Sequence, residues 1–227
     1  MKKTRHAFTL TVCAAALAVA APAAYAQEVP VPSGEMLAET VHADTSAAGN
    51  ATCTAPALFN PLTGFKDRRD YFVAPAGDFE NPEMPGWQLE GGASLVAGGS
   101  THAVLGNTNL SLALPPGSSA TSPEMCVDLN YPTFRFFATQ LEPDTDAQLA
   151  IDVIYPALAE KNVRQAERFR LKSRDGWELS HDIKLEPQRL GKRSGWRKVA
   201  IRFRVEPGKR PASYRIDDVL IDPRRLY

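Results

Sequence analysis

Alternation of apolar and polar side chains is the feature that most constrains this sequence. It runs through four stretches, residues 110–114, 149–155, 177–185 and 199–206. In the last of them, Ile201 and Phe203 alternate with Arg202 and Arg204. A period of two places successive side chains on opposite faces of a β-strand. The pattern therefore predicts antiparallel strands with one packed face and one wet face.

Turn-forming residues separate these stretches. They occur at residues 115–117 (Pro-Pro-Gly), 142–144 (Glu-Pro-Asp), 175–176 (Asp-Gly), 195 (Gly) and 207–208 (Pro-Gly). Only residues 157–167 favour a helical turn. About eight to ten short strands at this spacing are typical of sandwiches and jelly rolls. We expect an all-β fold, an antiparallel β-sandwich of the jelly-roll type.

The first 26 residues have the composition of a secretory signal peptide. Lys2, Lys3 and Arg5 precede an uncharged apolar run over residues 7–21, and residues 24–26 read Ala-Tyr-Ala. A membrane anchor is the alternative, but the run is shorter than the roughly 20 residues that span a bilayer. We therefore predict cleavage after Ala26 and a secreted, extracellular protein.

Residues 27–52 are rich in Ala, Thr, Ser and Pro and carry acidic but no basic side chains. Such a composition buries too little apolar surface to offset chain entropy. We expect a disordered acidic linker, although a propeptide has the same composition. The folded domain is then expected over residues 53–227.

Two cysteines remain after cleavage, Cys53 and Cys126. An even pair in an exported chain predicts a disulfide. Loss of the signal peptide removes three basic residues and no acidic one, so the net charge changes from zero to −3. Residues 53–160 hold four basic and thirteen acidic side chains, whereas residues 161–227 hold nineteen and nine.

Two motifs at opposite ends of the domain resemble a known fold. They are Gly77-Asp78-Phe79-Glu80 followed by Gly86-Trp87, and Tyr214-Arg215-Ile216-Asp217-Asp218-Val219. Both resemble the first and last strands of galactose-binding-like jelly rolls, the fold of many carbohydrate-binding modules. The middle of the domain, residues 112–121, 125–127 and 132–137, is similar to a set of uncharacterised bacterial secreted proteins. The resemblance implies the fold more strongly than a function.

The resemblance also implies a structural calcium ion. In that group the Phe-Glu carboxylate and an Asp of the last strand share the ion, which here corresponds to Glu80 and Asp217, with Asp78 as a further donor. Calcium takes six to eight oxygen ligands. Asp217 and Asp218 are neighbours on a strand, so only one of them is expected to face the ion. The alternative is that these acids pair with Arg215 or cap a turn.

Two kinds of side chain are candidates for ligand binding. Sugar rings stack on exposed aromatic faces, and Trp177, beside a turn, is the best candidate. Arg202 and Arg204 share the wet face of one strand and would attract an anionic polymer, or they pair with the acidic half of the domain. The remaining aromatic candidates are Tyr131, Tyr155, Trp87 and Trp196, of which the two tryptophans are expected in the core.

No motif of a catalytic site is present. The sequence contains no GxSxG, HExxH or phosphate-binding glycine loop. His181 shares the alternation of Leu179 and Ile183, so we expect it in the core. We predict a monomeric, non-catalytic protein that binds carbohydrate or another cell-surface polymer, without nucleic acid or a membrane span. The alternatives are an adhesive protein that binds protein partners and, less favoured, a glycan-acting hydrolase.

Overall fold

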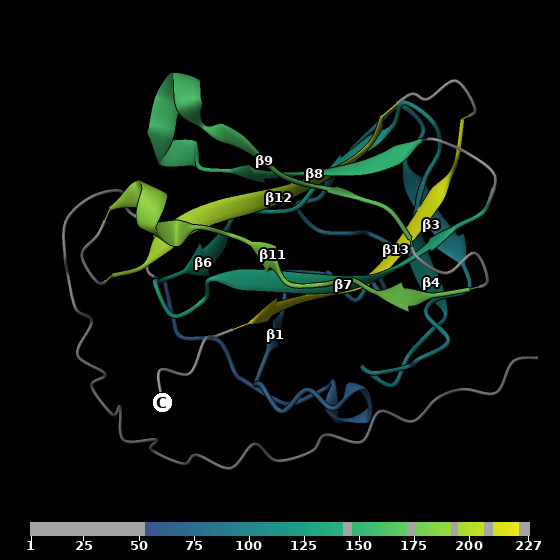
Figure 1. Cartoon of the computed structure of the whole chain (residues 1–227), viewed down its shortest axis with the longest axis horizontal. Coiled ribbons are helices and arrows are strands. Elements are labelled where there is room, and N and C mark those ends of the chain that lie inside the picture. Colours follow the sequence, from purple (N-terminus) through teal and green to yellow (C-terminus); the bar gives the residue numbers. More distant parts are fainter. Residues whose placement is uncertain (1–52, 143–146, 172–175, 192–194, 207–210, 223–227) are drawn as a thin grey trace, which may run out of the picture. The chain divides into compact units, whose positions relative to one another are not determined.

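Two antiparallel sheets form the domain in the computed structural model, which describes residues 53–142, 147–171, 176–191, 195–206 and 211–222. The signal peptide and linker predicted over residues 1–52 lie outside the described residues. The first sheet has seven strands in the order β10-β7-β13-β4-β3, with β1 beside β13 and β11 beside β7 (Figure 1). Its strands are β1 (Phe72–Val73), β3 (Ser94–Ala97), β4 (Leu110–Leu114), β7 (Thr133–Gln140), β10 (Glu178–Leu179), β11 (Ile183–Lys184) and β13 (Tyr214–Asp222).

The second sheet has six strands in the order β2-β5-β12-β8-β9, with β6 beside β12. Its strands are β2 (Gln88–Glu90), β5 (Ser119–Thr121), β6 (Met125–Val127), β8 (Gln148–Ile154), β9 (Val163–Phe169) and β12 (Arg197–Glu206). Three short 3-10 helices complete the described elements: η1 (Thr63–Phe65), η2 (Pro156–Lys161) and η3 (Pro187–Leu190). The all-β sandwich is confirmed. The described part of the chain holds thirteen strands, more than expected, because several of them are only two or three residues long.

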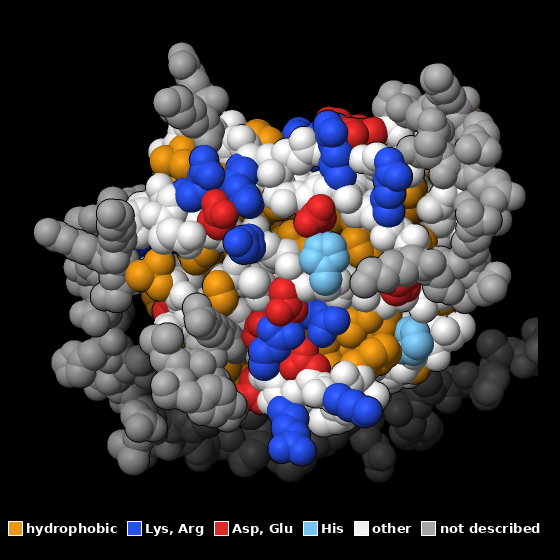
Figure 2. All heavy atoms as spheres, in the orientation of Figure 1, with side chains coloured by type: hydrophobic (Ala, Val, Ile, Leu, Met, Phe, Trp, Pro, Cys, Tyr) orange, Lys and Arg blue, Asp and Glu red, His pale blue; other side chains and the backbone are white. Residues whose placement is uncertain are grey.

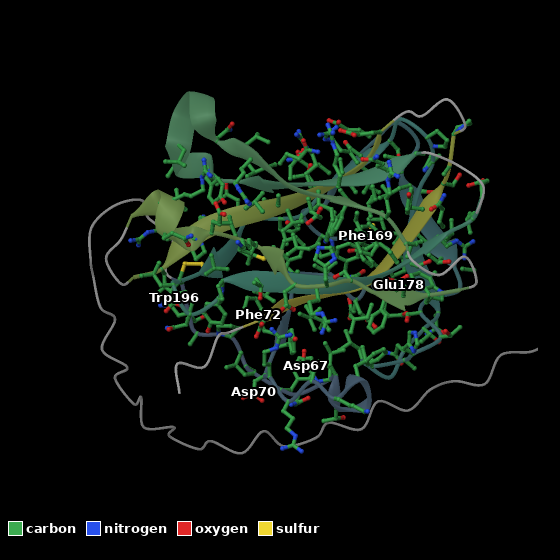
Figure 3. The ribbon with its side chains drawn as sticks, in the orientation of Figure 1. Asp67, Asp70, Phe72, Phe169, Glu178 and Trp196 are labelled. Carbon is green, nitrogen blue, oxygen red and sulfur yellow. A yellow bond between two sulfur atoms is a disulfide. The ribbon has the colours of Figure 1, made fainter. Side chains whose placement is uncertain are left out.

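The predicted alternation is clearest in β12. Val199, Ile201 and Phe203 have no exposed surface and point into the main core between the sheets. The aromatic ring of Phe136 on β7 meets those of Phe203 on β12 and Phe169 on β9, with centroids 5.0 and 5.4 Å apart. Figure 3 labels Phe169, whose side chain lies between the two sheets. Edge-to-face ring pairs therefore join the two sheets across the core.

A second, smaller core lies on the outer face of the seven-stranded sheet. Leu62 and Tyr71, from the segment before β1, pack on Phe137 of β7 and Leu220 of β13. All four side chains are fully buried. This face of the sheet is therefore covered by the segment around η1, which runs below β1 and β7 in Figure 1.

The disulfide between Cys53 and Cys126 is confirmed. Cys126 lies on β6 of the six-stranded sheet, and the chain that starts at Cys53 leads to β1 of the seven-stranded sheet. The covalent bond therefore ties the segment that covers one sheet to the other sheet.

The predicted single strand over residues 177–185 is wrong. Leu179 pairs with Phe137 and Ile183 pairs with Phe134. The distance from 179 to 183 is four residues, whereas the matching distance along β7 is three, so one extra residue lies between β10 and β11. A one-residue slip moves the following side chains to the other face of the sheet. As a result Leu179 packs on the smaller core and Ile183 on the main core.

Three further expectations are corrected by the structure. His181 lies at the slip and is 52% exposed as a side chain, not buried in the core. Residues 157–167 are not one helical turn, because η2 gives way to strand β9 at Val163. Tyr131 and Tyr155 are buried, and the hydroxyl of Tyr155 donates to the carbonyl of Leu185 at 2.7 Å.

Candidate functional site

The outer face of the six-stranded sheet carries two cross-strand rows of side chains. One row is Gln88, Thr121, Arg202, Asp152 and Gln165, on β2, β5, β12, β8 and β9. The parallel row is Glu90, Ser119, Arg204, Ala150 and Arg168. Neighbouring strands lie about 4.8 Å apart, so each row is about 19 Å long. Nearly every position in them offers a hydrogen-bonding group.

A buried carboxylate holds two arginines at the centre of these rows. Oδ2 of Asp152 accepts hydrogen bonds from Nε and Nη2 of Arg202 at 3.0 and 2.6 Å and from Nε of Arg204 at 2.9 Å. The side chain of Asp152 is 2% exposed, whereas each arginine is 32% exposed. The hydrogen bond to Asp152, together with the charge of that carboxylate, raises the pKa of Arg204. We call Arg202, Asp152 and Arg204 the arginine pair site.

Both arginines keep part of their hydrogen-bonding capacity. Nη1 of Arg202 takes part in none of the hydrogen bonds among the described residues, while Nη1 of Arg204 donates to Glu206 at 3.0 Å. Glu206 also pairs with Arg168 at 3.3 Å. Two acids, Asp152 and Glu206, therefore neutralise the three arginines around the centre only in part. The pairing with acidic residues that the sequence predicted is present, and a basic surface remains partly exposed.

Trp177 directly precedes β10 of the opposite sheet and is half-buried. It packs against the smaller core, and its carbonyl is 3.2 Å from Nε2 of His102. The ring of His102 contacts those of Phe65 and Phe137, with centroids 5.0 Å apart in each case. We call Phe65, His102, Phe137 and Trp177 the aromatic patch. Of the other tryptophans, Trp87 is in the core as expected and Trp196 packs half-buried at its edge.

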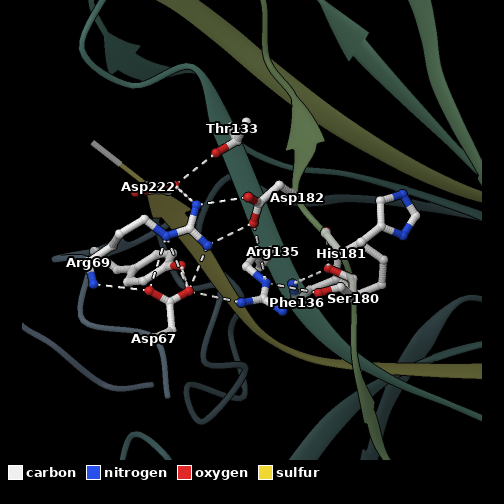
Figure 4. Close-up of polar contacts among 10 residues, drawn as sticks. Asp67, Arg69, Thr133, Arg135, Phe136, Ser180, His181, Asp182 and Asp222 are labelled. Carbon is white, nitrogen blue, oxygen red and sulfur yellow. Dashed lines mark hydrogen bonds and ion pairs between the residues drawn. The ribbon is translucent and has the colours of Figure 1, made fainter. Parts of the chain in front are cut away.

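Charged side chains gather beside this patch. Arg69 contacts the carboxylates of Asp67, Asp182 and Asp222 at 2.6 to 2.8 Å, and Arg135 contacts Asp67 at 3.0 Å (Figure 4). Burial raises the pKa of Asp67, but the hydrogen bonds from Arg69 and Tyr71 outweigh it and hold that pKa below its ordinary value. We call Asp67, Arg69, Arg135, Asp182 and Asp222 the Arg69 cluster.

The predicted calcium ligands lie near one another in the fold. Asp217 accepts from the backbone N–H of Ser100 at 2.6 Å, and Glu80 accepts from the backbone N–H of Asn109 at 2.8 Å. Asp78 and Glu80 are both close enough to raise the pKa of Asp217. β1 pairs with β13, but the motif Gly77–Glu80 lies in the turn region after β1 and not in the first strand, as the resemblance had implied.

Asp218 departs from the expected geometry. It has a positive φ of 49°, and the register of β13 shifts between Asp217 and Leu220. This bulge breaks the alternation, so Asp217 and Asp218 are both buried, and neither oxygen of the Asp218 carboxylate has a hydrogen-bond partner among the described residues. Burial, and then the charges of Asp217, Asp78 and Glu80, raise its pKa to about 8.

A buried carboxylate without a donor is the kind of ligand that a cation satisfies. No set of three or more His, Cys, Asp or Glu side chains in the described ranges converges on one point as metal ligands would. A cation here would therefore take few carboxylates and complete its shell with carbonyl or water oxygens. Asp218 then joins Asp78, Glu80 and Asp217 as a candidate ligand, although strand alternation predicted that only one of Asp217 and Asp218 would face the ion.

Several residues of these sites were missed from the sequence. Asp152 stood only as a polar position in an alternating strand, and Phe65, His102 and Arg69 lie in segments without any periodic pattern. The charge of Asp152 at the centre of an apolar stretch was the one available signal, because an acid there needs a basic partner.

Among the described residues no helix is long and apolar enough to cross a membrane.

No family model matches the chain, and no curated protein matches its sequence. Its fold is similar to that of several solved structures. TmCBM61 in complex with beta-1,4-galactotriose is 16% identical, with 69% of this chain and 99% of that one covered and a TM-score of 0.38. The carbohydrate-binding module CBM28, specific for non-crystalline cellulose, is 12% identical, with 67% and 96% covered and a TM-score of 0.43.

An enzyme is among the similar structures as well. The Stig cyclase Fisc from Fischerella sp. TAU is 10% identical, with 68% of this chain and 98% of that one covered and a TM-score of 0.42. These TM-scores are all below 0.5, so the description of the fold depends on the two sheets themselves and the function on the residues of the sites.

Proposed function

We propose that this protein is a secreted, monomeric, non-catalytic binding protein for carbohydrate, and that the arginine pair site takes an anionic cell-surface polysaccharide. The observation that carries the proposal is the pair of guanidinium groups held on the sheet by the buried Asp152. Because that carboxylate fixes both side chains, little side-chain entropy is lost when a ligand binds. Guanidinium groups also match the two oxygens of a carboxylate or sulfate ester.

The two rows of polar side chains support the same proposal. A polysaccharide chain offers hydroxyl groups along its length, and Gln88, Thr121 and Gln165 can bond to them on either side of the arginines. The outer face of the seven-stranded sheet is less open, since the segment around η1 covers much of it. Export is supported by the disulfide, because such bonds persist in oxidising compartments.

We also propose that calcium binds Asp218, with a second carboxylate from its neighbours Asp78, Glu80 and Asp217 and with carbonyl or water oxygens completing the shell. The support is the donor set, which consists of oxygen atoms only and includes a buried carboxylate without a hydrogen-bond partner. A calcium ion there would have a structural role, since it would neutralise the carboxylates that β13 and the loop after β1 bring together.

Affinity electrophoresis in gels containing polygalacturonate, or its fully methyl-esterified form, tests the polysaccharide proposal. The wild type should be retarded by the charged polymer, less so as salt rises, and only weakly by the ester. The triple variant Arg202→Gln, Asp152→Asn, Arg204→Gln should lose this retardation. It leaves no buried charge unpaired, because it neutralises all three members of the site.

The matched control is Arg189→Gln. Arg189 is an exposed arginine in η3, and its loss changes the net charge by the same single unit as the triple variant. This control should be retarded like the wild type. Equal retardation of the triple variant would contradict the site, and a wild type that no polysaccharide retards would favour the protein-binding alternative.

A further inference from the structure

The aromatic patch and the Arg69 cluster adjoin on the outer face of the seven-stranded sheet. Phe137 and Arg135 are two residues apart on β7, so their side chains leave the same face of the sheet about 7 Å apart. In Figure 2 hydrophobic side chains reach the surface directly beside a compact group of acidic and basic side chains, in the part of the view where Figure 3 labels Asp67.

The patch has an exposed aromatic ring on a rigid base. Phe65 is 38% exposed, while Phe137 beneath it has no exposed surface, and their ring centroids are 5.5 Å apart. His102 is exposed and is held from one side by the ring of Phe137 and from the other by its contact with the Trp177 carbonyl. The aromatic surface is therefore supported by packing, which keeps its position fixed when a ligand binds.

The cluster beside it offers a fixed and partly exposed hydrogen-bond acceptor. The side chain of Asp182 is 43% exposed, and its two oxygens accept from Nη1 and Nη2 of Arg69 at 2.8 and 2.9 Å. Each carboxylate oxygen has more than one lone pair, so Asp182 can still accept from a ligand hydroxyl. All five N–H groups of Arg69 donate to Asp67, Asp182 and Asp222, so Arg69 holds the carboxylate of Asp182 in place.

The local charge selects the class of ligand. The Arg69 cluster has two positive side chains and three negative ones, so it carries a net charge of −1. Lys66, Arg68 and Asp70 of the same segment bring the sum to zero, so this surface does not favour an anion as the arginine pair site on the other sheet does. A neutral sugar suits a site of this composition, because its C–H face covers an aromatic ring and its hydroxyls can donate to the exposed Asp182.

We propose that the aromatic patch and the Arg69 cluster together form a second carbohydrate site, which takes a neutral pyranose. Phe65 and Trp177 contact the ring face, and Asp182, held by Arg69, accepts hydrogen bonds from the hydroxyls. The inference goes beyond the proposed function, since the site lies on the other sheet and takes a different class of sugar. With both sites the protein is bivalent and can link an acidic polymer to a neutral one.

The test is affinity electrophoresis against neutral soluble polysaccharides: β-1,4-galactan, xylan, mixed-linkage β-glucan and galactomannan. At least one should retard the wild type, with little dependence on salt. Phe65→Ala should weaken that retention roughly tenfold, as expected for the loss of one aromatic contact. Asp182→Asn should weaken it as well, with the Trp177→Phe variant intermediate because a smaller ring remains.

Phe59→Ala is the matched control, since Phe59 is as exposed as Phe65 but lies outside the patch. It should bind like the wild type, and so should the triple variant of the arginine pair site. Retention of Phe65→Ala and Asp182→Asn at wild-type strength, with unchanged melting temperatures, would overturn the proposal, as would a wild type that none of the four polymers retards. A wild type that binds a neutral polymer but not polygalacturonate would refute only the arginine pair site.

Discussion

The buried aspartates of this protein differ in the hydrogen-bond donors that surround their carboxylates. Asp152 faces two guanidinium groups, Asp217 accepts from two backbone N–H groups, and Asp218 has no donor among the described residues. Burial raises the pKa of Asp217 to about 7 and that of Asp218 to about 8, with the neighbouring acids adding to the shift. In the absence of a cation this pair therefore costs stability at neutral pH.

The sign of the pH dependence follows from these two groups. The folded state holds their protons more tightly than the unfolded state, in which the pKa is about 3.9. Their contribution to stability is therefore complete below about pH 4 and is lost as pH rises toward about 8. In chelator, the free energy of unfolding of Asp218→Asn should exceed that of the wild type by a margin that grows from pH 4 to pH 8.

Calcium should act in the opposite direction. It binds the deprotonated acids, so its addition should raise the melting temperature of the wild type more at pH 8 than at pH 5, and that of Asp218→Asn much less. Glu124→Gln changes an exposed acid that directly precedes β6 of the other sheet; it is the control and should follow the wild type. Equal melting curves with calcium and with chelator at pH 8 would leave the acids as a proton-binding pair only.

At the scale of the element, β12 and β8 decide which side chains meet. Arg202 pairs with Asp152 in register, and Arg204 lies two residues further along the same face. The side chains of Arg202 and Arg204 lie over Ala150 and Asp152, so both faces of β8 are buried even though only one faces the core. A strand with an arginine layer on one side and the core on the other gains stability from both.

Removal of the central carboxylate should therefore cost stability. Asp152→Ala leaves two guanidinium groups side by side without their anion, and we expect a loss of about 1–3 kcal/mol in the free energy of unfolding, since both arginines remain partly solvated. Urea denaturation measures it. Arg204→Gln, which leaves Asp152 paired with Arg202, should cost less, and an Asp152→Ala variant as stable as the wild type would show that the pair contributes nothing.

For the whole molecule, the main core with the ring contacts of Phe136 holds the two sheets together, and one disulfide ties the segment before β1 to the six-stranded sheet. The cysteines are 73 residues apart in sequence, so the disulfide closes a long loop in the unfolded chain. The chain-entropy model gives about 4 kcal/mol for a loop of this length. The segment between Cys53 and β1 also covers the smaller core, which depends on that segment remaining in place.

The double variant Cys53→Ser, Cys126→Ser should unfold at a clearly lower urea concentration than the oxidised wild type, by roughly the free energy that the loop predicts. Wild type treated with reductant should shift to the same midpoint, which serves as the control. If all three samples unfolded at the same urea concentration, the disulfide would contribute nothing to stability.

Much of the fold followed from short-range patterns in the sequence. Alternation identified β4, β8 and β12, because a strand with one face in the core must repeat every two residues. The disulfide followed because only two cysteines remain outside the predicted signal peptide. Arg202 and Arg204 were expected on one face for the same reason, and β12 presents them there.

Only the tertiary structure decided what those side chains meet. Asp152 reaches Arg202 across 50 residues of chain, and a slip of one residue separates the surroundings of Leu179 from those of Ile183. The left-handed backbone of Asp218 brings a second acid into the cluster of Asp217. Register and bulges are set by pairing with neighbouring strands, and a local period of two carries no information about which strand the neighbour is or where a residue is added.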